Sequence, residues 1–394
     1  MKFKKYKKIS ASYFDSFRCI NSKCEFTCCG GWIVAIDKYK YRVVSDAIAK
    51  SNVDVDEVLS IEKDKSSGKS FGKLNLRNRF CPLLTSEYLC SLQKELGNDG
   101  LPVACATFPR IFNRVNNNII MSARVSCIEV ARLVLLDKKG LDLTFKKEES
   151  FDISGNFEVA VELDVTKKEF VFYNDLVIEF LFSLLKTKKR GISDRVKYVI
   201  LFVRELTLLK GSPGRRGLKS LFNKVKDLME KHEGINFRKD VNFQHDFIVG
   251  NIVPEHLAII EELNVHGRYK GLYDVFKTCK SIDLNTYEAK LEKFEAIFDE
   301  RYGYILRNFL LNFILNEIFP FKSGNIRYEA FRFTLNFAIL KFLFIISIEK
   351  GSDEDFAQIV FQYSRIFGNV EIPKLKHSFF TNSDEVFDLL SILC

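Results

Sequence analysis

The cysteines of this chain are crowded into one part of it, and this constrains the fold more than any other feature. Ten cysteines occur in 394 residues, and two of them, Cys279 and Cys394, stand apart from the rest. The basic start of the chain is followed by no apolar stretch or cleavage site typical of a secretory signal. We therefore expect a cytoplasmic protein, in which clustered thiols are more often metal ligands than disulfides. The predicted metal ligands are Cys19, Cys24, Cys28, Cys29, Cys81, Cys90, Cys105 and Cys127.

The spacing of these cysteines bears on the identity of the metal. The first block reads C-x4-C-x3-C-C, and the sequence lacks the paired C-x2-C knuckles of structural zinc sites. Scattered thiolate ligands favour an iron–sulfur cluster, with zinc as the alternative. Eight thiols suffice for two four-thiolate sites, or for one cluster with the remaining thiols packed as inert side chains. Because Cys28 and Cys29 are adjacent, we do not expect both to bind the same iron, and one of them fits a second site.

Hydrophobic patterning divides the chain into three parts. Residues 1–135 show little helical periodicity and are predicted to form a loop-rich, cysteine-rich metal domain, with a hairpin over residues 114–120. Residues 136–167 alternate with the period of half-buried strands, which predicts a short antiparallel sheet. Residues 168–394 follow the helical period, with a breaker at residues 211–217, which predicts a helical bundle. The expected fold class is mainly α with a small α+β part.

Apolar windows, net charge and histidines argue against several classes of function. Residues 308–316 and 333–348 are the most apolar, but asparagines interrupt the first and Lys341 interrupts the second. Both are shorter than the roughly 18 apolar residues that a span needs, so we expect buried helices and no membrane insertion. The net charge of +9 is concentrated around the first cysteines, where it offsets a thiolate cluster, so no nucleic-acid partner is expected. The five histidines are dispersed, and we expect each on the surface or hydrogen-bonded in the core.

Residues around the cysteines carry a resemblance to a known family. Beside the eight cysteines, the positions concerned are Tyr13, Phe17, Trp32, Pro82, Leu89, Leu96, Gly97, Phe108, Pro109, Arg110, Ser126, Glu129, Ala131 and Arg132. In order and spacing they resemble the flagellin lysine N-methylase (FliB-type) family, within the wider group of CxxCxxCC-type cysteine-cluster proteins. The resemblance is dense over residues 13–135. Across the helical half it is limited to Phe319-Pro320-Phe321 and Tyr363-Ser364-Arg365, and Ile128 stands where many relatives have proline.

The resemblance implies a cytoplasmic protein-lysine N-methyltransferase of the bacterial flagellum. The implied substrate is flagellin, the implied methyl donor is S-adenosylmethionine, and the N-terminal cysteines would hold an iron–sulfur cluster, most simply 4Fe-4S. The residues themselves show only the thiol set, because the sequence has no G-x-G-x-x-G and the radical motif C-x3-C-x2-C fails at Gly31. The site for S-adenosylmethionine, the residue that deprotonates lysine, the division of the cysteines between sites and the oligomeric state are left open. The alternative is a non-catalytic iron–sulfur or zinc-binding scaffold or chaperone.

Overall fold

The computed structural model describes residues 5–31, 34–50, 54–61, 71–77, 79–150, 159–163, 173–209, 214–234, 240–263, 269–349, 351–368, 387, 390 and 392–394. The strands are β1 (Lys5–Ala11), β2 (Ala35–Ile36), β3 (Leu59–Ile61), β4 (Gly72–Leu74), β5 (Arg110–Val115), β6 (Asn118–Ala123), β7 (Leu143–Ser150) and β8 (Val159–Leu163). The shorter helices of the first part are α1 (Lys38–Ala49), α2 (Val55–Val58), α3 (Ser91–Leu96), α4 (Val103–Thr107) and α5 (Ile128–Leu135). The helices of the second part are α6 (Asn174–Lys186), α7 (Ile192–Leu208), α8 (Gly214–Lys231), α9 (Val241–Phe247), α10 (Val253–Leu263), α11 (Lys270–Ser281), α12 (Leu284–Arg301), α13 (Gly303–Asn316), α14 (Ile326–Ser347) and α15 (Asp353–Phe367).

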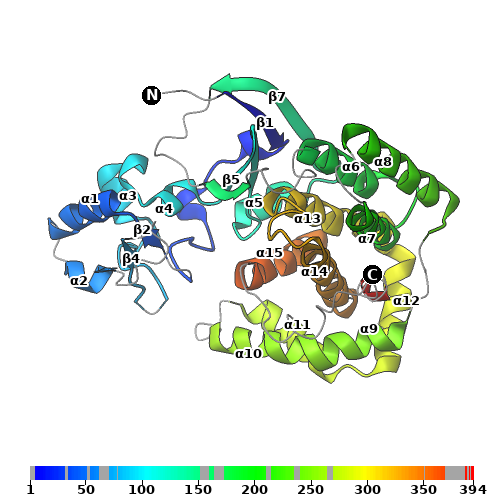
Figure 1. Ribbon diagram of the computed structural model, residues 1–394. Coiled ribbons are helices and arrows are strands. Elements are labelled where there is room, and N and C mark those ends of the chain that lie inside the picture. The colour runs from blue at the N-terminus through cyan, green and yellow to red at the C-terminus, as the bar shows by residue number, and fades with distance from the viewer. Residues whose placement is uncertain are drawn as a thin grey trace.

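Figure 1 shows three groups of elements: α1 to α4 on one side, a sheet near the middle, and an array of helices from α6 to α15 on the other side. The prediction of a mainly α fold with a small β part is confirmed. The helical array is the largest group, and α14 runs through its centre, surrounded by its neighbours. Trp32 and the turn that the alternation suggests at residues 154–156 lie outside the described residues.

The central sheet has five strands in the order β7-β1-β6-β5-β8. Its middle is the predicted hairpin, with β5 and β6 antiparallel and Val115 paired with Asn118 across a turn in which Asn116 has a φ of 55°. Asparagine tolerates this left-handed backbone conformation better than most residues. Because β1 is parallel to β6 and β8 is parallel to β5, the sheet is mixed rather than purely antiparallel. The two strands of residues 136–167 form its opposite edges, so they share one sheet with the N-terminal strands.

A second, smaller body is built from α1 to α4 and the three-stranded sheet β2-β4-β3. Its core is a small apolar cluster that includes Val44 and Ile48 of α1. Helix α1 begins after Asp37, whose carboxylate accepts hydrogen bonds from the backbone N–H groups of Tyr39 and Lys40. The expectation of little helix before residue 135 was wrong here, because the capping aspartate and the spaced apolar residues specify a helix although charged residues dominate its exposed face.

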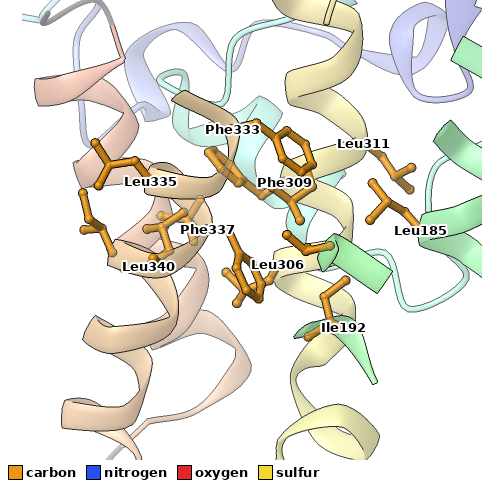
Figure 2. Close-up of a cluster of buried hydrophobic side chains, with 14 of the residues drawn as sticks. Leu185, Ile192, Leu306, Phe309, Leu311, Phe333, Leu335, Phe337 and Leu340 are labelled. Atoms are coloured by element: carbon orange, nitrogen blue, oxygen red, sulfur yellow. The ribbon is translucent and has the colours of Figure 1, made fainter. Parts of the chain in front are cut away.

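The helical array agrees closely with the predicted periodicity. Helices α6 and α7 each bury a run of apolar residues, and the N-cap of α6 is Tyr173. Helix α8 begins at Gly214, so the breaker predicted at residues 211–217 ends earlier than expected. Figure 2 shows Leu306 and Phe309 of α13 between Phe333 and Phe337 of α14 on one side and Leu185 and Ile192 on the other. These contacts make one continuous core, which also includes buried residues of β1, β6 and α5.

Helix α14 is long and apolar enough to cross a membrane by length and composition alone, and it is the single such helix among the described residues. Of its most apolar stretch, 83% is buried inside the protein. Lys341, which interrupts this stretch in the sequence, donates a hydrogen bond to the main-chain oxygen of Cys394 at 2.7 Å. The hydrophobicity of α14 is thus explained by its place at the centre of the helical array.

Three asparagines fasten α13 to the sheet and to α5. Asn308, Asn312 and Asn316 recur every fourth residue, which places them on one face of the helix. The Asn312 amide donates to the Ala123 carbonyl at 3.0 Å, and the Asn316 amide donates to the same oxygen at 3.2 Å. Asn308 donates to the carbonyl of Val134 at 2.9 Å. This asparagine row satisfies backbone groups at the end of β6 and at the end of α5, and it fixes the position of the segment between them, which contains Cys127.

Candidate functional site

Backbone pairing brings five of the predicted ligands into one neighbourhood. The N–H of Cys81 donates to the carbonyl of Cys29 at 2.9 Å, so the two cysteine segments lie side by side. Gly30 permits this approach, because a Cβ on it would meet the carbonyl oxygen of Arg79 at 2.8 Å. A bridge between Leu84 and Cys90 then turns the chain back on itself. We call the resulting set the inner thiol group: Cys28, Cys29, Cys81, Cys90 and Cys105.

The thiols of the inner group interact directly. Hydrogen bonding of the Cys29 thiol with those of Cys28 and Cys90 lowers the pKa of Cys28 and Cys90 and raises that of Cys29. Cys90 directly precedes α3 and also receives hydrogen bonds from backbone N–H groups at the start of that helix. Burial raises the pKa of Cys81 to about 11 and also raises that of Cys105. In both thiols the negative charges of neighbouring thiolates add to this effect. Sulfurs that repel one another's charge in this way are suited to bind a cation between them.

The other three predicted ligands, Cys19, Cys24 and Cys127, form what we call the outer thiol group. Cys24 donates to the carbonyl of Phe26 at 3.1 Å, and burial raises its pKa. Cys127 lies at the start of α5, and burial raises its pKa to about 11 against the hydrogen bonds that it receives from backbone N–H groups. The pKa values of Cys24 and Cys127 are both also raised by the charge of Cys28, so Cys28 stands between the two groups.

The residue types of the inner thiol group suit a metal ion, but the positions of their side chains do not form a metal site. In the part of the chain that the structure describes, no three His, Cys, Asp or Glu side chains converge closely enough to hold a metal ion. The donor set is nevertheless chemically suited to a thiophilic metal, because the inner group offers four half-buried cysteines and the exposed Cys28 from three segments. Cys279 and Cys394 are buried elsewhere, as the sequence suggests. The eight predicted ligands therefore remain predictions.

A cavity of about 450 Å³ lies where the helical array meets the segment before Cys127. Its walls are the segment 124–126, the end of α13 with the turn after it, the first half of α14, and the end of α15. Both family-like motifs of the helical half border it, since Tyr363-Ser364-Arg365 lines it directly and Phe319-Pro320-Phe321 lies in the turn between lining residues Glu317 and Lys322. Residues that the sequence separates by more than 200 positions thus meet at one place.

Two buried carboxylates line this cavity, and basic groups neutralise both. Glu317 accepts hydrogen bonds from the Lys322 ammonium at 2.7 Å and from the Arg332 guanidinium at 2.8 Å. Burial alone would raise the pKa of Glu317, but these two cations hold it below its usual value. Glu329 is fully buried and accepts from Arg332 at 3.1 Å and from the backbone N–H of Ser323 at 2.9 Å.

Arg365 of α15 connects the cavity to the cysteine segments. Its guanidinium donates to the carbonyl of Thr27 at 2.5 Å and to the carbonyl of Ser126 at 3.3 Å. These residues directly precede Cys28 and Cys127, and the charge of Arg365 contributes to the lowered pKa of Cys28 after the hydrogen bond from Cys29. Beside it, the rings of Phe26 and Phe361 pack edge to face with centroids 4.7 Å apart. The cavity and the thiols are therefore parts of one region.

His256 of α10 is the lining residue that the sequence did not reveal. It is 1% exposed, and its Nδ1 lies 2.9 Å from the carbonyl oxygen of Ile252. Its Nε2 is buried and makes no hydrogen bond to any described residue, and the same holds for the hydroxyl of Ser364. His256 is thus hydrogen-bonded in the core, as expected, but only through Nδ1. No local pattern in the sequence signals it, because packing of α10 against α15 creates the environment.

Comparisons with known proteins bear on this geometry. Residues 179–394 match the family described as FliB lysine N-methylase C-terminal domain, which covers more than half of the chain. The chain belongs to the FliB lysine N-methylase family. The match contains α7 to α15, most of the cavity wall, and both motifs of the helical half. No solved structure matches the chain.

Curated relatives are similar over a shorter stretch. The flagellar biosynthetic protein FliU of Salmonella muenchen is 31% identical over 141 residues, which cover 34% of this chain and 81% of that protein. A lysine-N-methylase of Salmonella choleraesuis is 30% identical over 139 residues, and one of Salmonella typhimurium is 29% identical over 140 residues. In both cases the matched stretch covers 34% of this chain and 34% of the relative.

Proposed function

We propose that this protein transfers a methyl group to the ε-amino group of lysine residues in flagellin, in the cytoplasm. S-adenosylmethionine is the proposed methyl donor. The observation that carries the proposal is the cavity of about 450 Å³, which lies between the family-matched helices and the cysteine segments and is large enough for a small molecule or a side chain. The names of the curated relatives, flagellar biosynthetic protein and lysine-N-methylase, support the same reaction and the same kind of substrate.

The reaction requires a lysine amine without its proton. A free lysine side chain has a pKa of about 10.4, so at neutral pH almost every molecule carries a positive charge and has no lone pair for attack. The neutral amine forms a bond to the methyl carbon while the bond between that carbon and the donor sulfur breaks, and the sulfur keeps the electron pair. The new methylammonium then releases a proton to solvent. A site that disfavours the charged amine therefore supports the reaction.

The eight N-terminal cysteines are the proposed ligands of an iron–sulfur cluster. Within them, the inner thiol group is the set whose sulfurs already interact, which favours it as the main site. The thiolates of these cysteines would bind the iron of the cluster, and the bound cluster would cross-link three segments of the chain. Arg365 and the backbone carbonyls of Thr27 and Ser126 hold these segments against α15 in any case.

One experiment tests the enzymatic part. The full chain, purified without oxygen, is incubated with flagellin and with S-adenosylmethionine labelled in its methyl group. We expect label in lysine residues of flagellin, located by mass spectrometry, and none in flagellin whose lysines have been acetylated beforehand. Binding of flagellin and metal without any transfer of label would support the scaffold or chaperone alternative instead.

A second experiment tests the metal part on the same protein. We expect iron and sulfide in the purified chain, together with absorbance from thiolate-to-iron charge transfer. Cys90→Ser and Cys105→Ser, within the inner thiol group, should lower the iron content strongly. Cys279→Ser is the matched control, because Cys279 is a buried thiol of α11 that lies outside both thiol groups. Stoichiometric zinc in a colourless protein would contradict the iron–sulfur cluster but not the thiol site.

A further inference from the structure

The tautomer of His256 follows from its surroundings. A backbone carbonyl can only accept a hydrogen bond, so the ring nitrogen Nδ1, 2.9 Å from the oxygen of Ile252, must carry the proton. The imidazole is neutral, since burial lowers its pKa to about 4. Nε2 is then an acceptor with a lone pair, buried at the cavity and without a hydrogen-bond donor among the described residues. A buried acceptor of this kind is costly unless a ligand or a water donates to it.

Aromatic rings hold the imidazole in place. The ring of Tyr363 lies parallel to it, with an interplanar angle of 4° and centroids 6.0 Å apart. Phe276 stacks at 5.4 Å, and Phe367 lies at 4.2 Å with a tilt of 46°. Together with the bond from Nδ1 to Ile252, these contacts fix the direction of the Nε2 lone pair. The acceptor is therefore preorganised rather than formed when a ligand arrives.

The charges around the cavity determine which hydrogen-bond donor can enter it and bind to Nε2. Both carboxylates in its wall are already neutralised, Glu317 by Lys322 and Arg332, and Glu329 by Arg332. An ammonium ion entering the cavity would find no negative charge left to balance it and would face repulsion from the surplus of cations. An uncharged amine avoids that cost. The described ionic groups of the wall are Arg124, Lys322, Arg332 and Arg365 against Glu317 and Glu329.

We propose that the cavity receives the side chain of the lysine to be methylated, and that Nε2 of His256 accepts a hydrogen bond from its uncharged amine. The inference rests on the proposed function. It adds to that function the place where the substrate lysine binds and the residue that contacts its amine. An amine that donates one N–H to Nε2 keeps its lone pair free and turned away from the ring, as attack on a methyl group requires. The cavity of about 450 Å³ is larger than one lysine side chain.

The test measures binding before it measures catalysis. The probes are two short peptides that differ at one position, one with a lysine flanked by glycines and the other with norleucine in its place. Binding of each to the metal-loaded full chain is measured by calorimetry at a pH above 9, where more of the lysine is uncharged. We expect the wild type to prefer lysine over norleucine, and we expect His256→Phe to reduce that preference about tenfold, since it keeps a flat ring but removes the acceptor.

His256→Gln and His232→Phe are the matched variants. The carbonyl oxygen of glutamine can replace Nε2 as an acceptor, so H256Q should restore part of the preference for lysine that H256F loses. His232 follows the last residue of α8 and does not line the cavity, so H232F should leave the preference unchanged. Circular dichroism of each variant shows whether the helices remain folded. In the methyl-transfer assay, H256F should lower kcat/KM for flagellin and leave the affinity for S-adenosylmethionine unchanged.

Each outcome decides one of the two proposals. A wild type with no preference for lysine, or an H256F variant that keeps the wild-type preference, overturns the role of His256. An H256F variant that binds S-adenosylmethionine more weakly, with the lysine preference intact, overturns it in favour of a donor site in the cavity. A wild type that prefers lysine, loses the preference in H256F, and yet transfers no methyl group supports the pocket and overturns the proposed function alone.

Discussion

The body of α1 to α4 and the helical array differ in how much apolar surface each of them buries. The first has a small cluster of buried side chains drawn from short helices and strands. The second shares one large core with the central sheet and buries aromatic residues such as Phe333 and Phe337 completely. Because hydrophobic burial scales with apolar area, the array and the sheet gain more from their shared core than the smaller body gains from its own, so the smaller body depends more on other links. The inner thiol group belongs to the smaller body, where a bound metal would contribute most.

The thiol groups and the cavity also differ in the kind of structure that surrounds them. The cysteines lie on loops and at the starts of short helices, where backbone N–H groups are available to sulfur. The cavity is walled by long helices, and its two carboxylates, Glu317 and Glu329, are paired with Lys322 and Arg332. Cysteines on loops beside a cavity between long helices are consistent with a cofactor bound by the thiol groups and a substrate bound in the cavity.

Removal of a central ring tests the comparison most strongly. Phe337→Ala in α14 deletes a side chain with 0% exposure, and we expect it to lower the free energy of unfolding by about 3–5 kcal/mol. Ile297→Ala on α12 is the control, because that side chain is 40% exposed and its loss should cost about 0.5 kcal/mol or less. Urea denaturation followed by circular dichroism measures both. If F337A cost no more than I297A, the array would not derive its stability from this core.

The buried ionic group of the array gives the next largest effect. In Glu317→Gln, the hydrogen bonds from Lys322 and Arg332 lose their charged acceptor, which we expect to cost about 2–3 kcal/mol at pH 7. Because the pKa of Glu317 is lower in the folded chain than in the unfolded chain, its contribution is complete above the unfolded pKa and is lost as the pH falls through the folded pKa. The difference in Tm between wild type and E317Q should therefore shrink on acidification below about pH 4.3. Glu87→Gln, at an exposed side chain, is the control variant. A constant difference for E317Q would contradict the ionic explanation.

The asparagine row tests whether the sheet and the array unfold as one. Asn312 accepts from the hydroxyl of Tyr13 at 2.5 Å and donates to the carbonyl of Ala123 at 3.0 Å, so Asn312→Ala leaves two buried groups with fewer partners. We expect a loss of about 1–2 kcal/mol. Asn251→Ala is the control, since the Asn251 amide bonds only to Phe247 within its own helical segment among the described residues.

Two probes of the same denaturation sharpen this result. Circular dichroism reports mainly the helices, whereas the fluorescence of the single tryptophan reports the cysteine-rich part of the sequence. If the row couples the two parts, the two transitions coincide in the wild type and separate in N312A. If they still coincide in N312A, contacts other than the row couple the parts.

The sequence predicted the helical half well because its information is local. A run of apolar residues at the helical period, as in α7 and α13, determines both the helix and the face that it buries. The hairpin of β5 and β6 was likewise predictable from its asparagine turn. The mixed sheet was not, because β1 pairs with strands more than 100 residues later in the chain, and no periodicity encodes such pairing.

The site shows the same limit. The cysteines could be selected by residue type and spacing, but their division into an inner and an outer group depends on the pairing of Cys29 with Cys81. His256 could not be identified as a site residue from the sequence. The lone pair on its Nε2 results from the tautomer that the carbonyl of Ile252 imposes, and the packing of Tyr363 holds the ring in place. A sequence motif identifies functional residues when they lie in one segment of the chain. It does not identify a residue such as His256, whose environment is formed by several separate helices.

The smallest expected effect concerns the link between the outer thiol group and α5. Arg132 donates to the carboxylate of Glu25 at 2.7 Å, with the two side chains 42% and 54% exposed. This pair holds the segment of Cys24 beside the helix that begins after Cys127. Exposed ion pairs contribute about 0.2–1 kcal/mol, and salt screens them, so we expect Arg132→Ala to cost no more than this in low salt and less at high salt.

A double-mutant cycle with Glu25→Gln isolates the interaction. Lys189→Ala with Glu230→Gln is the matched cycle at an exposed pair of the array, whose charged atoms are 2.8 Å apart. The hydrogen bonds of Arg365 to Thr27 and Ser126 already fix the ends of both segments, so the outer group keeps its place without Arg132. Equal coupling energies in the two cycles would fit this view. A coupling energy several times larger for Arg132 and Glu25 would instead place the outer thiol group among the elements that stabilise the array, and would weaken the contrast between the two regions.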